Sequence, residues 1–176
     1  RKNGLALRHM SKSLRRDEKV VLSAVENNGN ALQYANRSSR KNKTIVLAAV
    51  SNSGLALAFA SKTMQRCKEV VLVAVHESGK ALRYASSKLK KDREVVMTAI
   101  QQDGDSYVYA HSSLKKDKEI VKTASKYSDQ IGKLLPRQLH DENFLLVLLK
   151  DKVLSYGFAS LNRTNTKAII RWLPQE

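Results

Sequence analysis

Glycine recurs at a strict interval of 25 residues through most of the chain, and this regularity limits the fold more than any other feature. The positions are Gly4, Gly29, Gly54, Gly79 and Gly104. A fixed period of this length indicates repeated supersecondary units, each of which buries its apolar face only against its neighbours. The spacing therefore predicts a stacked array of short units.

A short apolar pattern after each glycine predicts the first helix of a unit. In Ala31-Leu32-Gln33-Tyr34-Ala35 the apolar residues fall at i, i+1, i+3 and i+4, which is one face of a helix. Related patterns lie at 6–7, 56–60, 81–85 and, more loosely, 107–110.

A second apolar run in each unit is rich in valine and isoleucine, and a run of this kind read alone suggests a buried strand. Three observations favour a helix. Residues that cap a first turn precede the runs, namely Asp17, Asn42, Asp92 and Asp117. Negative charge that suits the helix dipole lies in that turn, at Glu69, Glu94 and Glu119. Each run ends at Asn-Gly, Ser-Gly or Asp-Gly, which we interpret as a left-handed helix stop.

These patterns predict an all-α solenoid of about seven two-helix repeats of ~25 residues. Residues 1–127 hold five regular units. Residues 128–176 are expected to hold two divergent units, because Asp141–Leu149 and Asn165–Leu173 fit the second-helix pattern. Their bulkier residues, such as Phe144 and Trp172, are typical of a C-terminal cap that closes the core.

Two segments resemble a known family. The pattern Asn-Gly-x-Ala-Leu-x-Tyr-Ala-Ser, followed by Leu-Lys-Lys-Asp-x-Glu-Val-Val-x-x-Ala-Val, is similar to the repeat of DUF4116, a domain of unknown function. The similarity is clearest at 80–100, extends over 3–127 and is weak after Ser128. The family has no assigned activity, so the resemblance implies helical repeats and transfers no catalytic residue.

The charge is strongly positive, since 32 Lys and Arg residues against 16 Asp and Glu residues give +16. This balance predicts attraction to a polyanion, such as nucleic acid, an anionic membrane or an acidic protein. No apolar run approaches the roughly 18 residues of a membrane span. The lone Cys67 excludes an internal disulfide and fits a reducing compartment. The sequence begins without Met, so we expect a processed intracellular protein, with an organelle reached after removal of a targeting peptide among the destinations.

Basic residues recur just before each capping position, as a pair in four units and as Gln65-Arg66 in the third, which predicts one positive ridge along an edge of the stack. The candidate nucleic-acid-binding residues are Arg15, Arg16, Arg40, Lys41, Arg66, Lys90, Lys91, Lys115 and Lys116. More basic residues follow at Lys19, Lys43, Lys68, Arg93 and Lys118, and others precede at Lys12, Arg37, Lys62 and Lys88. Cations beside a helix N-terminus oppose its dipole by about 0.3 to 1 kcal/mol, whereas a bound phosphate would favour them there. Ordinary solvation of a loop is the alternative interpretation.

Aromatic residues recur at one repeat position, as Tyr34, Phe59, Tyr84 and Tyr109. Stacking on nucleic-acid bases is one interpretation. Core packing is favoured, because the position shares the apolar face with Ala and Leu.

Residues that could support catalysis or metal binding do not converge in the sequence. His9, His76, His111 and His140 occupy unrelated repeat positions. Cys67 replaces the capping Asp, which we interpret as a poor cap in a divergent unit. We expect no enzyme activity, cofactor, metal or small-molecule substrate.

The leading hypothesis is a non-enzymatic module that docks on RNA phosphates within a ribonucleoprotein, with low sequence selectivity. The alternative is a protein–protein interaction scaffold that recognises an acidic or amphipathic partner.

Overall fold

The computed structural model describes residues 4–128, which form five copies of one unit and contain no β-strand. Each unit has a six-residue 3-10 helix, a three-residue 3-10 turn and a ten-residue α-helix. The six-residue helices are η1 (Gly4–His9), η3 (Gly29–Tyr34), η5 (Gly54–Phe59), η7 (Gly79–Tyr84) and η9 (Gly104–Tyr109). The turns are η2 (Leu14–Arg16), η4 (Ser39–Lys41), η6 (Met64–Arg66), η8 (Leu89–Lys91) and η10 (Leu114–Lys116). The α-helices are α1 (Glu18–Asn27), α2 (Lys43–Asn52), α3 (Lys68–Glu77), α4 (Arg93–Gln102) and α5 (Lys118–Tyr127).

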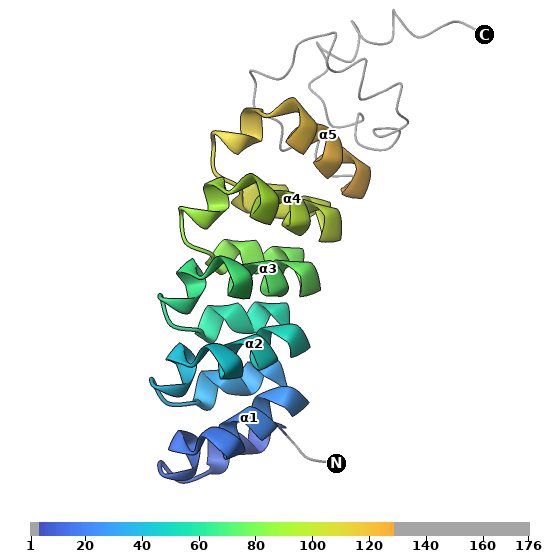
Figure 1. The fold of residues 1–176 in the computed structure, drawn as a ribbon. Coiled ribbons are helices and arrows are strands. Elements are labelled where there is room, and N and C mark those ends of the chain that lie inside the picture. Colours follow the sequence, from blue (N-terminus) through green and yellow to red (C-terminus); the bar gives the residue numbers. More distant parts are fainter. Residues whose placement is uncertain (1–3, 129–176) are drawn as a thin grey trace, which may run out of the picture.

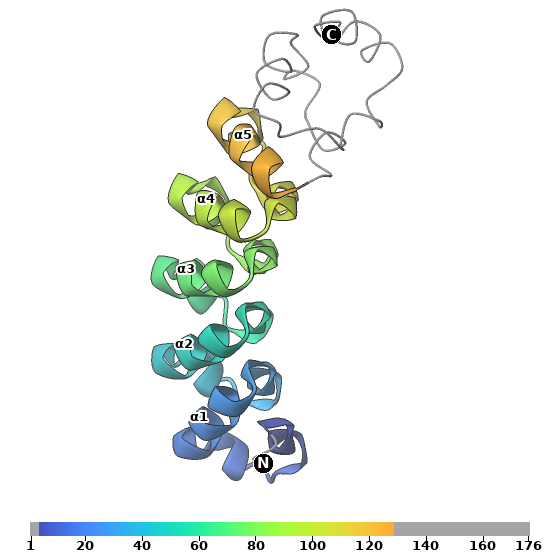
Figure 2. The same cartoon turned by 90° about the vertical axis from the view of Figure 1, so that its right-hand side faces the viewer.

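The units stack in chain order into an elongated array, with α1 and α5 near opposite ends of the described part (Figure 1). Each α-helix packs on the α-helix of the next unit, and the six-residue helices form a second column beside them (Figure 2). The segments that join the two columns lie together along one edge (Figure 1). This edge carries the basic turns.

The all-helical repeat architecture is confirmed, and two details differ from expectation. The first helix of each unit is 3-10, and the basic loop holds a second short 3-10 turn. Six residues give too few i→i+4 bonds to sustain an α-helix, so tighter bonds such as Ala35 N–H to the Leu32 carbonyl close the segment. The two further units expected at 128–176 lie outside the described residues.

Side-chain caps start four of the five α-helices. The side chains of Asp17, Asn42, Asp92 and Asp117 each accept bonds from the two backbone N–H groups two and three residues later. Cys67 occupies the same position in α3 and makes no capping bond, which confirms it as a poor cap.

The core is one continuous cluster to which every unit contributes the same positions. The first helices supply Leu7, Leu32, Leu57, Leu82 and Tyr107, all fully or almost fully buried. The α-helices supply mainly valine, isoleucine and alanine, such as Val46, Ala49 and Val50. Helical periodicity therefore places the β-branched runs inside the stack.

From the second unit onward, each glycine meets the α-helix of its own unit at very close range. A Cβ built on Gly29, Gly54 or Gly79 would overlap a backbone carbonyl oxygen of the following α-helix, that of Ala49, Ala74 or Ala99. The residue before each of these glycines is the helix C-cap and is extended, as at Ser53, and none of the glycines has a positive φ. The expected left-handed stop is therefore wrong, because the glycine is required by close packing.

Polar contacts also join successive units. Asn52 donates to the Glu26 carbonyl of the preceding unit (3.0 Å) and accepts from the Gly29 N–H at the start of its own unit (2.6 Å). Backbone bonds repeat along the basic edge, for example Ser61 N–H to the Arg40 carbonyl at 2.9 Å. These bonds fix each unit on its neighbour.

Candidate nucleic-acid interface

The first residue of each basic pair turns inward. Arg40 donates to the carbonyls of Ala35 (3.1 Å) and Gln33, at the end of the first helix of its own unit. In the same way, Lys90 donates to the Arg83 carbonyl and Lys115 to the Val108 carbonyl, each seven positions earlier in the chain. A cation that binds the last carbonyls of a helix satisfies groups that the helix leaves open. We call Arg15, Arg40, Lys90 and Lys115 the inner basic residues; all are partly buried.

The third unit shows that this role needs a hydrogen-bond donor rather than a charge. Gln65 occupies the inner position, is buried, and donates to the Leu57 carbonyl at 3.1 Å. Burial lowers the pKa of Lys90 and of Lys115, because it disfavours their charged forms. The inner position therefore serves the fold first.

The second residue of each basic pair turns outward. We call these the outer basic residues: Arg16, Lys41, Arg66, Lys91 and Lys116. All five are exposed, and their side chains make no hydrogen bond or ion pair with any residue of the described range. The ridge predicted from the sequence is thus divided, and its outer half remains available to a ligand.

Basic residues at the start of the α-helices are used between units. Lys43 pairs with Glu69 at 2.5 Å, and Lys68 pairs with Asp92 at 2.8 Å and Glu94 at 2.7 Å. Arg93 pairs with Asp117. These cations are neutralised by the next unit and add little to the ridge.

Hollows open between successive units along the outer residues. One lies between the first and second units (about 330 Å³), one between the second and third (about 690 Å³) and one between the third and fourth (about 400 Å³). Each is lined by basic side chains of one unit and by an aromatic ring of the next. The rings are Tyr34, Phe59 and Tyr84.

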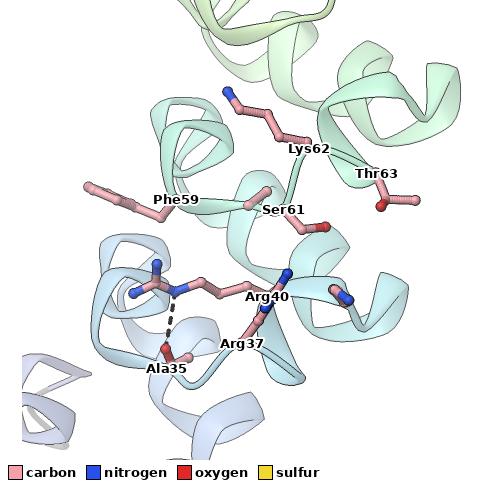
Figure 3. A pocket seen from close by; sticks show the side chains of 9 residues that line it. Ala35, Arg37, Arg40, Phe59, Ser61, Lys62 and Thr63 are labelled. Atoms are coloured by element: carbon pink, nitrogen blue, oxygen red, sulfur yellow. Dashed lines mark hydrogen bonds between the residues drawn. The ribbon is translucent and has the colours of Figure 1, made fainter.

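The largest hollow shows the arrangement most clearly. Arg37, Arg40 and Lys41 come from the second unit, and Phe59, Ser61 and Lys62 from the third. In Figure 3 the Phe59 ring and the Arg40 guanidinium extend to the same side of the stack, with Arg40 held by its bond to the Ala35 carbonyl. The planar apolar ring of Phe59 thus lies among several cationic side chains.

The recurring aromatic residues are only partly buried. Tyr34, Phe59, Tyr84 and Tyr109 pack against the core from its margin. The core-packing interpretation is therefore correct in that each ring packs against the core, but each ring also keeps part of its surface exposed. Sequence reasoning missed the hollows, although an aromatic residue just before the basic loop in four of the five units was the available signal.

Other chemistry-bearing residues stay apart in the described range. Its His, Cys, Asp and Glu residues form no group of three that could hold a metal ion. His140 lies outside that range. Within 4–128 no helix has the length and hydropathy that a bilayer crossing requires.

Comparison with known proteins agrees with the repeat. The model of a family described as a domain of unknown function, DUF4116, matches residues 1–40, 17–65, 42–90, 67–115 and 92–139. Successive matches after the first begin one 25-residue unit apart, at 17, 42, 67 and 92. Searches of curated proteins and of solved structures gave no match. Because the matches together cover most of the chain, the protein belongs to the DUF4116 family.

Proposed function

We propose that this protein is a non-enzymatic module that binds RNA through its backbone phosphates, as part of a ribonucleoprotein. The observation that carries the proposal is the row of outer basic residues, one per unit, exposed and without partners among the described residues. Cations held at a regular interval along a rigid edge suit a ligand whose negative charges also repeat. Low sequence selectivity follows, because phosphate contacts carry no base information.

Local energetics support a ligand at this edge. Cations just before a helix N-terminus oppose the helix dipole, so helix stability does not favour the outer residues. Arg40, Lys90 and Lys115 each bond to carbonyls at the end of their own unit's first helix, whereas the outer side chains make no hydrogen bond or ion pair in the described range. An RNA phosphate would supply the missing counter-charge.

The experiment compares two variants that carry equal net charge. The outer variant changes Arg16, Lys41, Lys91 and Lys116 to Gln; the inner variant changes Arg15, Arg40, Lys90 and Lys115 to Gln. Each loses four positive charges from the same four units, which takes +16 to +12. Gln65 shows that Gln keeps the inner capping bond, so the inner variant is expected to fold.

The readout is the affinity of each protein for a mixed-sequence single-stranded RNA. We expect the outer variant to lose about 10²-fold at physiological salt, as the release of four fewer counterions implies. The inner variant should keep most of the affinity. Equal losses in both variants would show that net charge alone attracts RNA and would refute the ridge. Preference for an acidic polypeptide over RNA would favour a protein scaffold instead.

A further inference from the structure

We infer that the inter-repeat hollows accept unstacked bases, so that the ligand is a single strand, with the principal base position against Phe59. This inference rests on the proposed function and deepens it. The outer residues alone would hold any phosphate backbone, single or double stranded. The hollows add a feature that a phosphate does not need, namely an aromatic ring beside the cations in each of three successive interfaces.

The hollows are equivalent by symmetry of the repeat. The basic wall is formed by one position that precedes the turn (Lys12, Arg37, Lys62), by the inner position and by the outer position. The opposite wall is formed by the ring and the small residues after it. A strand that follows the edge would therefore meet the same pair of groups, cation and ring, once per unit.

The hollow at Phe59 is the largest of the three, and its neighbours explain why. The residue before the ring is Ala58 here, but Gln33 and Arg83 in the units on either side. The Arg83 guanidinium carbon lies 4.9 Å from the centroid of the Tyr84 ring, so that ring already has a planar partner. Ala58 cannot cover Phe59 in this way, in keeping with the larger volume of about 690 Å³.

The pairing of cations with an aromatic ring in each hollow distinguishes a single-stranded nucleic acid from other anionic ligands. A lipid headgroup or a free phosphate would engage the cations but leave the ring unused. The bases of a duplex are stacked on one another and cannot enter a hollow. A single strand offers a phosphate and a free π-face in every residue, and stacking on an aromatic ring is tolerant of base identity.

The test uses the intact chain with Phe59→Leu and Phe59→Tyr. Leucine preserves an apolar contact with the core but has no π-face. Tyrosine is the residue at the equivalent positions 34 and 84, so it is a matched control that the hollow accommodates. The probes are a mixed-sequence RNA oligonucleotide, the same strand annealed to its complement, and an abasic ribose-phosphate strand of equal length.

For the parent, we expect the single strand to bind at least about tenfold tighter than the abasic strand, since stacking one base is worth about 1–3 kcal/mol. Phe59→Leu should lose about five- to a hundredfold for the single strand only. Phe59→Tyr should bind like the parent. The dependence of affinity on salt should not change in either variant, because no cation is removed.

The outcomes separate the two proposals. If the parent binds all three probes equally well, or if Phe59→Leu weakens all three equally, the hollows take no base, while the phosphate ridge stands. If no probe binds in a salt-dependent way, both proposals fall. Circular dichroism and unfolding of each variant show whether a loss reflects binding; should Phe59→Leu not fold, equal binding of single strand and abasic strand by the parent would still refute the inference.

Discussion

At the scale of single residues, glycine marks the place where the six-residue helix and the α-helix of one unit come closest. The Gly54 Cα faces the Ala74 carbonyl oxygen so closely that no side-chain atom fits between them. Its own φ is not in the left-handed region, so the backbone conformation alone would accept other residues. Glycine is thus required at this position by a packing contact within the unit, and a side chain there should push the six-residue helix and the α-helix of the unit apart.

We predict that Gly54→Ala destabilises the protein by about 1–3 kcal/mol, because the added methyl group must push the carbonyl of the next helix away. Denaturant unfolding measures this effect. Leu55→Ala, at an exposed neighbour, is the control and should change stability by less than about 0.5 kcal/mol. Asn is the usual substitute for a left-handed glycine, so a Gly54→Asn protein as stable as the parent would support the helix-stop account instead.

The missing cap of α3 gives a second prediction at this scale. Cys67→Asp should stabilise the protein by about 0.5–2 kcal/mol, because Asp17, Asp92 and Asp117 make the capping bonds that Cys67 lacks. The gain is measured by denaturant unfolding, with Cys67→Ala as a control that adds no acceptor. No gain from Asp over Ala would show that the start of α3 is satisfied in another way.

Residue roles were predictable from the sequence where they depend on local chemistry. The four caps and the poor cap at Cys67 follow from side-chain type and position. The role of glycine did not follow, because the contact it makes is with a residue 20 positions later in the chain, in the α-helix of the same unit. Local sequence cannot distinguish a glycine that needs its φ from one that needs its missing Cβ.

At the scale of elements, the starts of successive α-helices are tied by ion pairs. Lys68 lies between Asp92 and Glu94 of the next helix, and its hydrogen bond lowers the pKa of Asp92. Between the first two units the corresponding contact is a hydrogen bond from Asn42 to Glu18, 3.2 Å long. The α2–α3 and later junctions therefore depend on charge, whereas α1–α2 depends on it less.

This arrangement predicts a pH dependence with a definite sign. Because the folded-state pKa of Asp92 is depressed, its contribution is present above the ordinary pKa of 3.8 and is lost as the pH falls through the folded value. Asp92→Asn removes the charge but keeps the cap, as Asn42 does in α2. The stability difference between parent and variant should shrink from about pH 5 to pH 2. A difference that stays constant over this range would show that the ion pair contributes nothing.

Element types were predictable only with the repeat in view. The valine-rich runs resemble strands, and caps plus periodicity correctly indicated helices. The 3-10 character of the six-residue helices did not follow, because the apolar pattern does not show whether so short a segment closes with i→i+3 or i→i+4 bonds. Comparing equivalent positions among the repeats was therefore more informative about helix and strand than the residue propensities of any single repeat.

At the scale of the whole molecule, stacking of the repeats places the basic loops of successive units along one edge. Each unit contacts mainly its neighbours in the described part, so the outer basic residues and the hollows recur along one side. The sequence predicted the ridge but not its division, since both residues of a pair look alike until the first one is seen to cap its own unit's helix. Gln65 was the one clue in the sequence to this division, because among the five described units only the third lacks a charge at the inner position.

The most direct test of the ridge is the slope of log affinity for single-stranded RNA against log salt, measured between about 50 and 200 mM for the parent and the matched variants. Each phosphate contact to a single strand contributes about −0.7 to this slope, so the outer variant should have a slope shallower by about 3. The inner variant, with the same net charge, should keep the parent slope. Equal slopes for the parent and the outer variant would contradict the assignment of the outer residues to RNA phosphates.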